Sequence, residues 1–217
     1  MNIELARFNM IEQQIRPWDV LDLAVLELLA VVKREDFVPL AYKAMAFVDT
    51  EVPLPGGQCM LAPKVEARLL QELGVRKHER VLEIGAGSGY MAALLAHRAQ
   101  QVTTFEIRPE LARMAAENLR RAGVMNAKVI EGDGAEGLQA DAPLDVILLS
   151  GSVAEVPMTL LQQLKVGGRL AAIVGQQPVM RATVVTRTAD HGYETAALFD
   201  TVAQRLDGFP EPTRFRF

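Results

Sequence analysis

The chain has few of the residues that cross-link a protein or draw it to nucleic acid. Cys59 is the only cysteine among 217 residues, which excludes an intrachain disulfide and fits a reducing compartment. Acidic residues outnumber lysine and arginine by 27 to 23, and the net charge of −4 argues against non-specific binding to DNA or RNA, because that binding needs a positive field. We therefore expect a cytoplasmic protein without a nucleic-acid partner.

Long apolar runs are also missing from the sequence. The densest one, residues 20–32, is interrupted by Asp22 and Glu27 and is too short to cross a bilayer. The stretch MNIELARFNMIEQQIRP contains acids and no continuous apolar segment, so we expect neither a secretory signal nor a membrane partner. Half of the residues are hydrophobic, which suffices for a real core, and the length favours one domain with an accessory part.

The amino-terminal part is predicted to be helical. Apolar residues recur every three or four positions over residues 5–15, and Pro17 ends this pattern. Asp19 is the predicted N-cap of a second helix, which continues to about Val32. We expect residues 1–63 to form a helical part with a loop at its end, packed on the main domain.

From residue 64 to residue 217 the pattern changes to short apolar strands that alternate with amphipathic helices. This alternation is typical of βαβ units around a parallel sheet with helices on both faces, which is an α/β fold. Two alternating segments after Gly175, separated by a turn, predict an antiparallel hairpin that closes the sheet. The predicted strands are 80–84, 101–107, 127–131, 145–150, 169–174, 181–188 and 193–199, and the predicted helices are 91–99, 109–122 and 157–164.

The strongest motif is VLEIGAGSGY, residues 81–90, in which a buried strand runs into alternate glycines and then into a helix. Glycines let the backbone turn sharply and let a ligand approach peptide N–H groups at a helix start. The dinucleotide fingerprint needs its third glycine one residue later, where this chain has Tyr90, so the spacing counts against NAD or FAD. It favours the related loop that cradles the amino-acid end of S-adenosylmethionine, with Glu83 placed to receive its ammonium group.

Two further strand ends carry acids. Glu106 ends the next predicted strand, where a carboxylate accepts both hydroxyls of a ribose. One strand later, the segment EGDG places Asp133 and Gly134 where an adenine amino group would be bound. Each feature alone also fits a tight turn, a solvated strand end or a turn-forming aspartate, but their order along three strand ends predicts a nucleoside-containing cofactor.

These motifs resemble the protein-L-isoaspartate O-methyltransferase family over about residues 8–199. The resemblance is carried by MIEQQIRP, KREDFVP, the GQ-x-x-x-AP loop, VLEIGAGSGY, GDGAEG, EVP and QLKVGGRL. It implies a class I methyltransferase fold, which is Rossmann-like: a doubly wound, mostly parallel seven-stranded sheet, here with a helical N-terminal extension. It also implies S-adenosyl-L-methionine as methyl donor and, as partner, a damaged protein or peptide whose isoaspartyl residue is methylated on its free α-carboxylate.

The residues and the resemblance together predict a cofactor site without metal ligands. Its predicted members are Glu83, Gly85, Ala86, Gly87, Ser88, Gly89, Glu106, Ile107, Asp133 and Gly134.

The substrate loop LPGGQCMLAPK, residues 54–64, departs from the family. There the frame is close to GQTISxP, and its serine is implied to orient the acceptor carboxylate. Here Leu61 stands at the serine position, Cys59 replaces the threonine after Gln58, and the approach is about two residues shorter. We predict no nucleophilic role for Cys59, because methyl transfer is a direct displacement that needs positioning and no covalent enzyme intermediate. An acceptor carboxylate, already charged at neutral pH, needs no general base.

Several alternatives remain open at this level. Because leucine cannot hydrogen-bond a carboxylate, the acceptor is either an isoaspartyl carboxylate or a changed one, a small-molecule acid or another protein carboxylate. Lys64 is either a substitute acid-binding group or an exposed helix-start residue. Ser150 and Ser152 either face the acceptor or form an ordinary loop, and Trp18 either closes over the site or packs in the core. A non-catalytic adenosyl-binding protein is the remaining alternative, without a positive sign in the chain.

Overall fold

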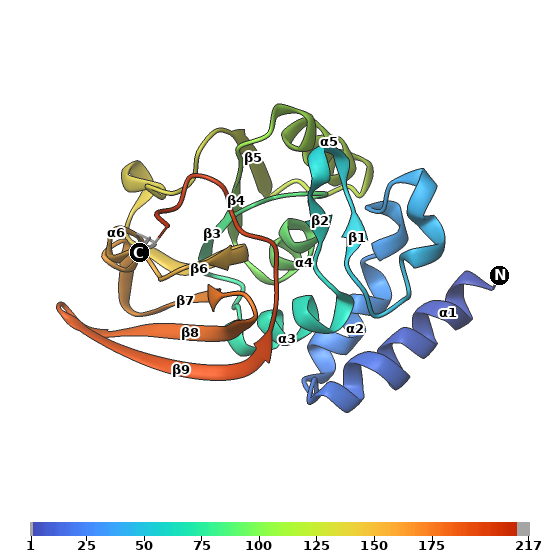
Figure 1. Cartoon of the computed structure of the whole chain (residues 1–217), viewed down its shortest axis with the longest axis horizontal. Coiled ribbons are helices and arrows are strands. Elements are labelled where there is room, and N and C mark those ends of the chain that lie inside the picture. The colour runs from blue at the N-terminus through green and yellow to red at the C-terminus, as the bar shows by residue number, and fades with distance from the viewer. Residues whose placement is uncertain (1, 212–217) are drawn as a thin grey trace, which may run out of the picture.

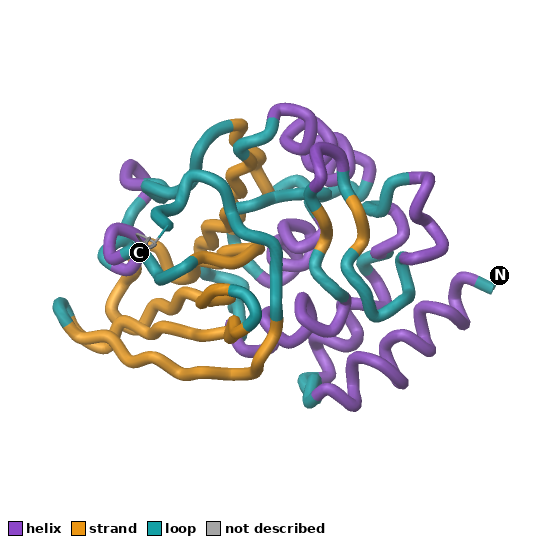
Figure 2. Tube along the Cα trace, viewed as in Figure 1, coloured by secondary structure: helices purple, strands orange, loops and turns teal. Residues whose placement is uncertain are grey.

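The computed structural model describes residues 2–211, and the C-terminal TRFRF segment, residues 213–217, lies outside them. Figure 1 shows a twisted sheet with helices packed on it and a helical amino-terminal part at one side. Figure 2 shows that this amino-terminal part is mostly helix and that the long strands of the second half form a hairpin at the edge of the molecule. No helix of the described range is long and apolar enough to cross a membrane.

The main sheet has seven strands in the order β5-β4-β3-β6-β7-β8-β9. Neighbours from β5 to β7 are parallel, whereas β8 and β9 run antiparallel to their neighbours, which confirms the predicted closing hairpin. After β5 the chain returns to the other side of β3, so the order reverses between β3 and β6 and opens a crevice at their carboxyl ends. The strands are β3 (Arg80–Ile84), β4 (Gln101–Glu106), β5 (Ala127–Glu131), β6 (Leu144–Val153), β7 (Leu164–Gln176), β8 (Val179–Ala189) and β9 (Gly192–Thr201).

The two faces of the sheet are covered unequally. Side chains alternate between two apolar clusters, with Val81 and Val146 in one and Leu82 and Ile147 in the other. The first face carries α3 (Pro63–Leu73), α4 (Tyr90–Arg98) and α5 (Pro109–Arg121), and the second carries the short α6 (Met158–Leu161). Helix α6 is shorter than the predicted 157–164, because Leu164 already pairs with β6 as the first residue of β7.

The amino-terminal part begins with α1 (Ile3–Met10), continues as one turn of π-helix and a 3-10 turn to Trp18, and then forms α2 (Leu23–Val31). The predicted N-cap at Asp19 is wrong. Asp19 has a left-handed backbone with φ of 60°, and Asp22 caps α2 instead, its carboxylate accepting from the N–H of Ala24 at 2.8 Å.

One apolar core joins the amino-terminal part to the sheet. Met10 and Leu29 belong to the same cluster as Leu94 of α4. The apolar pattern over residues 5–15 is buried only in its second half, since Leu5 and Phe8 are more than half exposed. This is consistent with the position of α1 at the edge of the molecule in Figure 1.

The first half of the substrate loop, together with the two residues before it, forms a small hairpin, residues 52–60, that the sequence did not reveal; we call it the substrate hairpin. Strand β1 (Val52–Pro53) pairs antiparallel with β2 (Cys59–Met60) around a turn, Pro55–Gly57. Gly56 and Gly57 both have positive φ, 68° and 72°, which lets the chain reverse within this short turn. Two-residue strands are too short to leave a periodic pattern.

Arg169 of β7 is the clearest single anchor of the fold. It donates to the carbonyls of Leu73 and Gly74 at 2.6 and 3.0 Å and pairs with the buried carboxylate of Glu79.

Arg169→Met leaves the buried carboxylate of Glu79 without its counter-charge, so we expect the free energy of unfolding to fall by about 3–5 kcal/mol in urea denaturation. As a control, Arg181→Met breaks an exposed pair with Asp200 and should cost less than about 1 kcal/mol. Equal losses in the two variants would contradict this assignment.

Candidate active site

The glycine loop lies at the crevice where the strand order reverses. Gly85, Gly87 and Gly89 all have positive φ, 95°, 53° and 84°, so each adopts a backbone that other residues rarely take. A Cβ on Gly89 would lie 3.1 Å from the Cα of Ala115, so glycine also lets α4 begin in close contact with α5. The motif therefore does what its spacing predicted, turning the chain from β3 into α4.

The loop is tied to the neighbouring strand by its own backbone. The N–H groups of Gly85 and Ala86 donate to the carbonyl of Phe105 at 2.9 and 3.0 Å. The N–H of Gly87 donates to the Glu106 carboxylate at 2.8 Å, and the other carboxylate oxygen accepts from the N–H of Arg108 at 3.0 Å. Glu106 is buried, and each of its oxygens keeps a further lone pair for a ligand hydroxyl.

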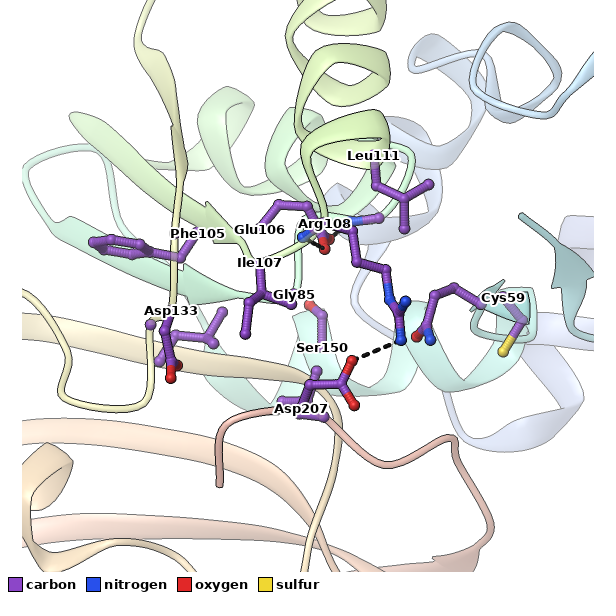
Figure 3. A pocket seen from close by; sticks show the side chains of 16 residues that line it. Cys59, Gly85, Phe105, Glu106, Ile107, Arg108, Leu111, Asp133, Ser150 and Asp207 are labelled. Atoms are coloured by element: carbon purple, nitrogen blue, oxygen red, sulfur yellow. Dashed lines mark hydrogen bonds and ion pairs between the residues drawn. The ribbon is translucent and has the colours of Figure 1, made fainter. Parts of the chain in front are cut away.

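Two adjoining hollows surround the loop. The first, shown in Figure 3, contains the predicted Glu106, Ile107 and Asp133. The second adjoins it along the loop and contains Glu83 and Leu61. Both hollows are lined by Gln58 or its neighbours on the substrate hairpin, and the residues they share are Cys59, Gly85, Gly87 and Ser150.

The remaining predicted cofactor residues divide between these hollows. Gly134 lines the first, where a Cβ would lie 2.9 Å from side-chain atoms of Ile84 and Phe105, so glycine lets the chain pass close to β3 and β4. Ala86 and Ser88 line the second. Gly89 lines neither hollow and acts through the turn into α4.

Glu83 is fully buried at the end of β3. The hydroxyls of Ser150 and Thr104 donate to its two carboxylate oxygens, each at 2.7 Å. Burial raises the pKa of Glu83 to about 7, and the two hydroxyl donors only partly oppose this rise. The carboxyl group therefore gains or loses its charge close to neutral pH, and a cation placed beside it would favour the charged form.

The substrate hairpin reaches the site, although its loop is shorter than in the related family. Leu61 is buried in the wall of the second hollow. Burial and the charge of Glu51 raise the pKa of Cys59 to about 12, so its thiol is protonated at neutral pH and donates to the Gln204 side chain at 3.4 Å. A protonated thiol is a poor nucleophile. The side-chain oxygen of Gln58, oriented to satisfy its neighbours, accepts from Arg108 at 2.8 and 3.1 Å.

The C-terminal segment supplies site residues that the sequence did not indicate. Leu206 and Asp207 line the first hollow, and Asp207 forms an ion pair with Arg108 at 2.7 Å (Figure 3). Gln204 donates to the carbonyl of Gly57 in the substrate hairpin at 2.9 Å. The segment is held beside β6, where the N–H of Ser152 donates to the Gln204 carbonyl at 2.8 Å. Of these residues, only Arg108 lies close in the sequence to a predicted site residue, because Glu106 is two positions before it.

Three residues whose roles the sequence left undecided form contacts outside the two hollows. Lys64 is the second residue of α3 and is half-buried, paired with Asp49 at 2.7 Å and lying over the Trp18 ring. Trp18 packs edge-on against Phe199 of β9, with ring centroids 5.1 Å apart. The Ser152 hydroxyl donates to a backbone carbonyl of the C-terminal segment. Among residues 2–211, no group of three or more His, Cys, Asp or Glu side chains is placed to hold a metal.

The sheet order, the glycine loop at the switch point and the buried acids beside it define a class I S-adenosylmethionine-dependent methyltransferase. Two solved chains show the same fold. A protein-L-isoaspartate O-methyltransferase has a TM-score of 0.77 at 24% identity, over 93% of this chain and 66% of that one. A Plasmodium falciparum structure in complex with S-adenosyl-L-homocysteine has a TM-score of 0.79 at 20% identity, over 95% of this chain and 99% of that one.

Sequence comparisons identify the family. The model of protein-L-isoaspartate(D-aspartate) O-methyltransferase matches residues 6–203. A protein-L-isoaspartate O-methyltransferase of Koribacter versatilis is 42% identical over 183 residues, which cover 84% of this chain and 82% of the relative. One of Methanoculleus marisnigri is 43% identical over 169 residues, which cover 78% and 77%. The chain belongs to the protein-L-isoaspartate O-methyltransferase family; it is an enzyme and uses S-adenosyl-L-methionine.

The buried carboxyl group at the end of β3 makes stability depend on pH. Because the folded-state pKa of Glu83 lies above the ordinary value of 4.5, its stabilising contribution is full below about pH 4.5 and is lost as the pH rises through about 7. Glu83→Gln cannot become charged. The free energy of unfolding of the variant, relative to that of the parent, should therefore rise by on the order of 1–3 kcal/mol between pH 5 and pH 8. The measurement is a series of denaturation curves without cofactor. A difference in the free energy of unfolding between variant and parent that stays constant with pH would show that burial does not raise the pKa of Glu83.

Proposed function

We propose that the protein methylates the free α-carboxylate of an isoaspartyl residue in a damaged protein or peptide. The observation that carries this proposal is the position of the substrate hairpin. Cys59 lines both hollows beside Gly85 and Ser150, so the hairpin meets the glycine loop where two hollows adjoin. A methyl group held at that junction would face an acceptor brought in by the hairpin.

We propose that the residues of the first hollow hold the adenosyl half of the cofactor. The two oxygens of Glu106 suit the two hydroxyls of a ribose, because a planar carboxylate offers paired acceptors. Asp133 and Gly134 at the end of β5 suit the adenine, and Ile107 gives an apolar contact beside it. The positive φ values of the loop support this fit, since they let a ligand approach bare backbone.

The second hollow suits the amino-acid end of the cofactor. Glu83 lies there with Ala86 and Ser88, and an ammonium group beside Glu83 would hold its carboxylate in the charged form. When bound, S-adenosylmethionine supplies a methyl group on a positively charged sulfur. The protein then needs only to bind, orient and exclude water, because an acceptor carboxylate attacks without a base. Gln58 and Leu61 shape the acceptor side of this junction, and Cys59 stays protonated.

We extend the proposal to the division of the chain and to its surroundings. Residues 1–63 would present the acceptor, and residues 64–217 would bind the cofactor. A single free thiol and an acidic net charge support a cytoplasmic enzyme that does not act on nucleic acid.

A changed acceptor is the second candidate, and the apolar side chain of Leu61 in the second hollow favours it, because it offers no hydrogen bond where the family serine is implied to orient the isoaspartyl carboxylate. A small-molecule acid or another protein carboxylate that carries its own apolar group would suit this wall. The two candidates share the cofactor site and differ only in what the hairpin recognises.

The ribose assignment can be tested by binding alone. Glu106→Ala removes both acceptor oxygens, so we expect the affinity for S-adenosylhomocysteine to fall by roughly 1.5–3 kcal/mol in calorimetry, with NAD failing to compete in the parent. Glu131→Ala is the matched control, because Glu131 pairs with Glu106 across β4 and β5 but is exposed at the strand end. An unchanged affinity in the Glu106 variant would refute the assignment.

The acceptor can be tested with an isoaspartyl peptide and its aspartyl twin. The parent should methylate only the isoaspartyl peptide, and slowly, because Leu61 gives no hydrogen bond. Leu61→Ser should then raise kcat/KM by roughly ten- to two-hundredfold, the range that one charge-assisted hydrogen bond supplies in a transition state. Cys59→Ser on the same hairpin should stay within about tenfold of the parent. Cofactor binding without turnover of either peptide, by parent and serine variant alike, would leave the changed acceptor as the answer.

A further inference from the structure

Arg34 is a buried cation behind the substrate hairpin that the proposed chemistry does not use. It lies in the KREDFVP segment, on a 3-10 turn after α2, and its side chain is 1% exposed. It lines neither hollow. Burying a guanidinium is costly unless its hydrogen bonds and its charge are satisfied, so its partners indicate what the burial achieves.

The partners of Arg34 come from three elements that meet at the site. One Nη atom donates to the backbone carbonyl of Leu61 at 2.8 Å, and the other forms an ion pair with Glu66 of α3. The guanidinium also lies over the ring of Tyr90, 5.1 Å from its centroid, and Tyr90 is the first residue of α4 after the glycine loop. Leu61, Glu66 and Tyr90 all line the second hollow.

The contact with Leu61 is made where the hairpin has no regular structure of its own. Strand β2 ends at Met60 and α3 begins at Pro63, so residue 61 lies in the link between them. A planar guanidinium can hold a carbonyl and a carboxylate at once while stacking on a ring, which the single ammonium of lysine cannot do. The geometry thus connects the acceptor side of the junction to the first turn of α4.

We propose that Arg34 is a positioning residue for the acceptor, which holds the backbone at Leu61 in register with the glycine loop. This inference rests on the proposed transfer to a carboxylate and adds the group that orders the acceptor side. Arg34 acts through Leu61 and Glu66 of the second hollow, so its loss should weaken acceptor recognition and leave the adenosyl half of the proposed cofactor site, in the first hollow, intact.

The test separates positioning from simple core packing. Arg34→Lys keeps a positive charge for Glu66 but loses the simultaneous bond to the Leu61 carbonyl. We expect its melting temperature to fall by no more than a few degrees, because the Leu61 carbonyl loses its donor. Its Kd for adenosine, which the proposal places only in the first hollow, should stay within about threefold of the parent's. Its KM for the isoaspartyl peptide should rise by about ten- to a hundredfold, because the backbone that presents the acceptor is no longer held; the free energy of one bond from a charged donor sets that range.

Two double variants control for lost stability. Arg34→Gln with Glu66→Gln removes the pair without leaving a bare buried charge, and Arg169→Gln with Glu79→Gln does the same at a buried pair on the far end of α3. Both should lower the melting temperature, but only the first should raise the KM. A KM unchanged in both Arg34 variants, or raised equally by the control, would overturn the inference.

Hydrogen exchange gives a reading that does not depend on the acceptor. Amides of residues 57–62 should exchange faster in both Arg34 variants than in the parent and in the Arg169 control, because the hairpin exit loses its tether. If the parent binds S-adenosylhomocysteine but methylates no isoaspartyl peptide, the proposed function fails, and the exchange rates still decide the role of Arg34. Unchanged exchange at residues 57–62 would then refute that role.

Discussion

The site depends on one backbone tether, the hydrogen bonds that join the glycine loop to the end of β4. Peptide N–H groups of Gly85 and Ala86 share the carbonyl of Phe105, and Gly87 donates to the Glu106 carboxylate. The loop and the proposed ribose acid are therefore placed by the same interaction. Because strands β3 and β4 are adjacent and parallel, their carboxyl ends meet at one edge, and the crevice beside them opens where the strand order reverses.

The residues that we propose for the cofactor could be selected from the sequence because their signals are local. Each lies at the carboxyl end of a strand or shortly after it, and residues 85–89, 106 and 133–134 were selected by that position. The substrate half was predicted only through the resemblance, since two-residue strands have no period. Arg108 and Asp207 form an ion pair although 99 positions separate them, and no spacing rule in a single sequence reaches so far. The N-cap prediction for the second helix failed because Asp19 and Asp22 are the same residue type. Only the left-handed backbone at Asp19 distinguishes it from the true N-cap, Asp22.

The departures from the family are concentrated on the acceptor side. Leu61 is buried where the resemblance implies a hydroxyl, and Lys64, which could have replaced that hydroxyl, is paired with Asp49 and lies over the Trp18 ring. The wall that we propose for the acceptor is thus apolar and acidic, while the loop backbone behind it is held by a buried arginine. An enzyme with this wall would rely on the shape of the hairpin and on the positive charge of the bound donor to draw in a carboxylate.

The burial of Glu83 links donor binding to protons. A carboxyl group whose pKa is about 7 in the protein without cofactor is partly protonated at neutral pH. If the cofactor's ammonium lies beside it, as we propose, the complex holds that group ionised, and binding expels a proton for each site that was protonated. The apparent affinity for the donor then weakens as the surroundings become acidic, with no change in any contact. Acidification would thereby lower the cofactor occupancy of the enzyme through the residue that lies beside the donor's ammonium group in the proposed complex.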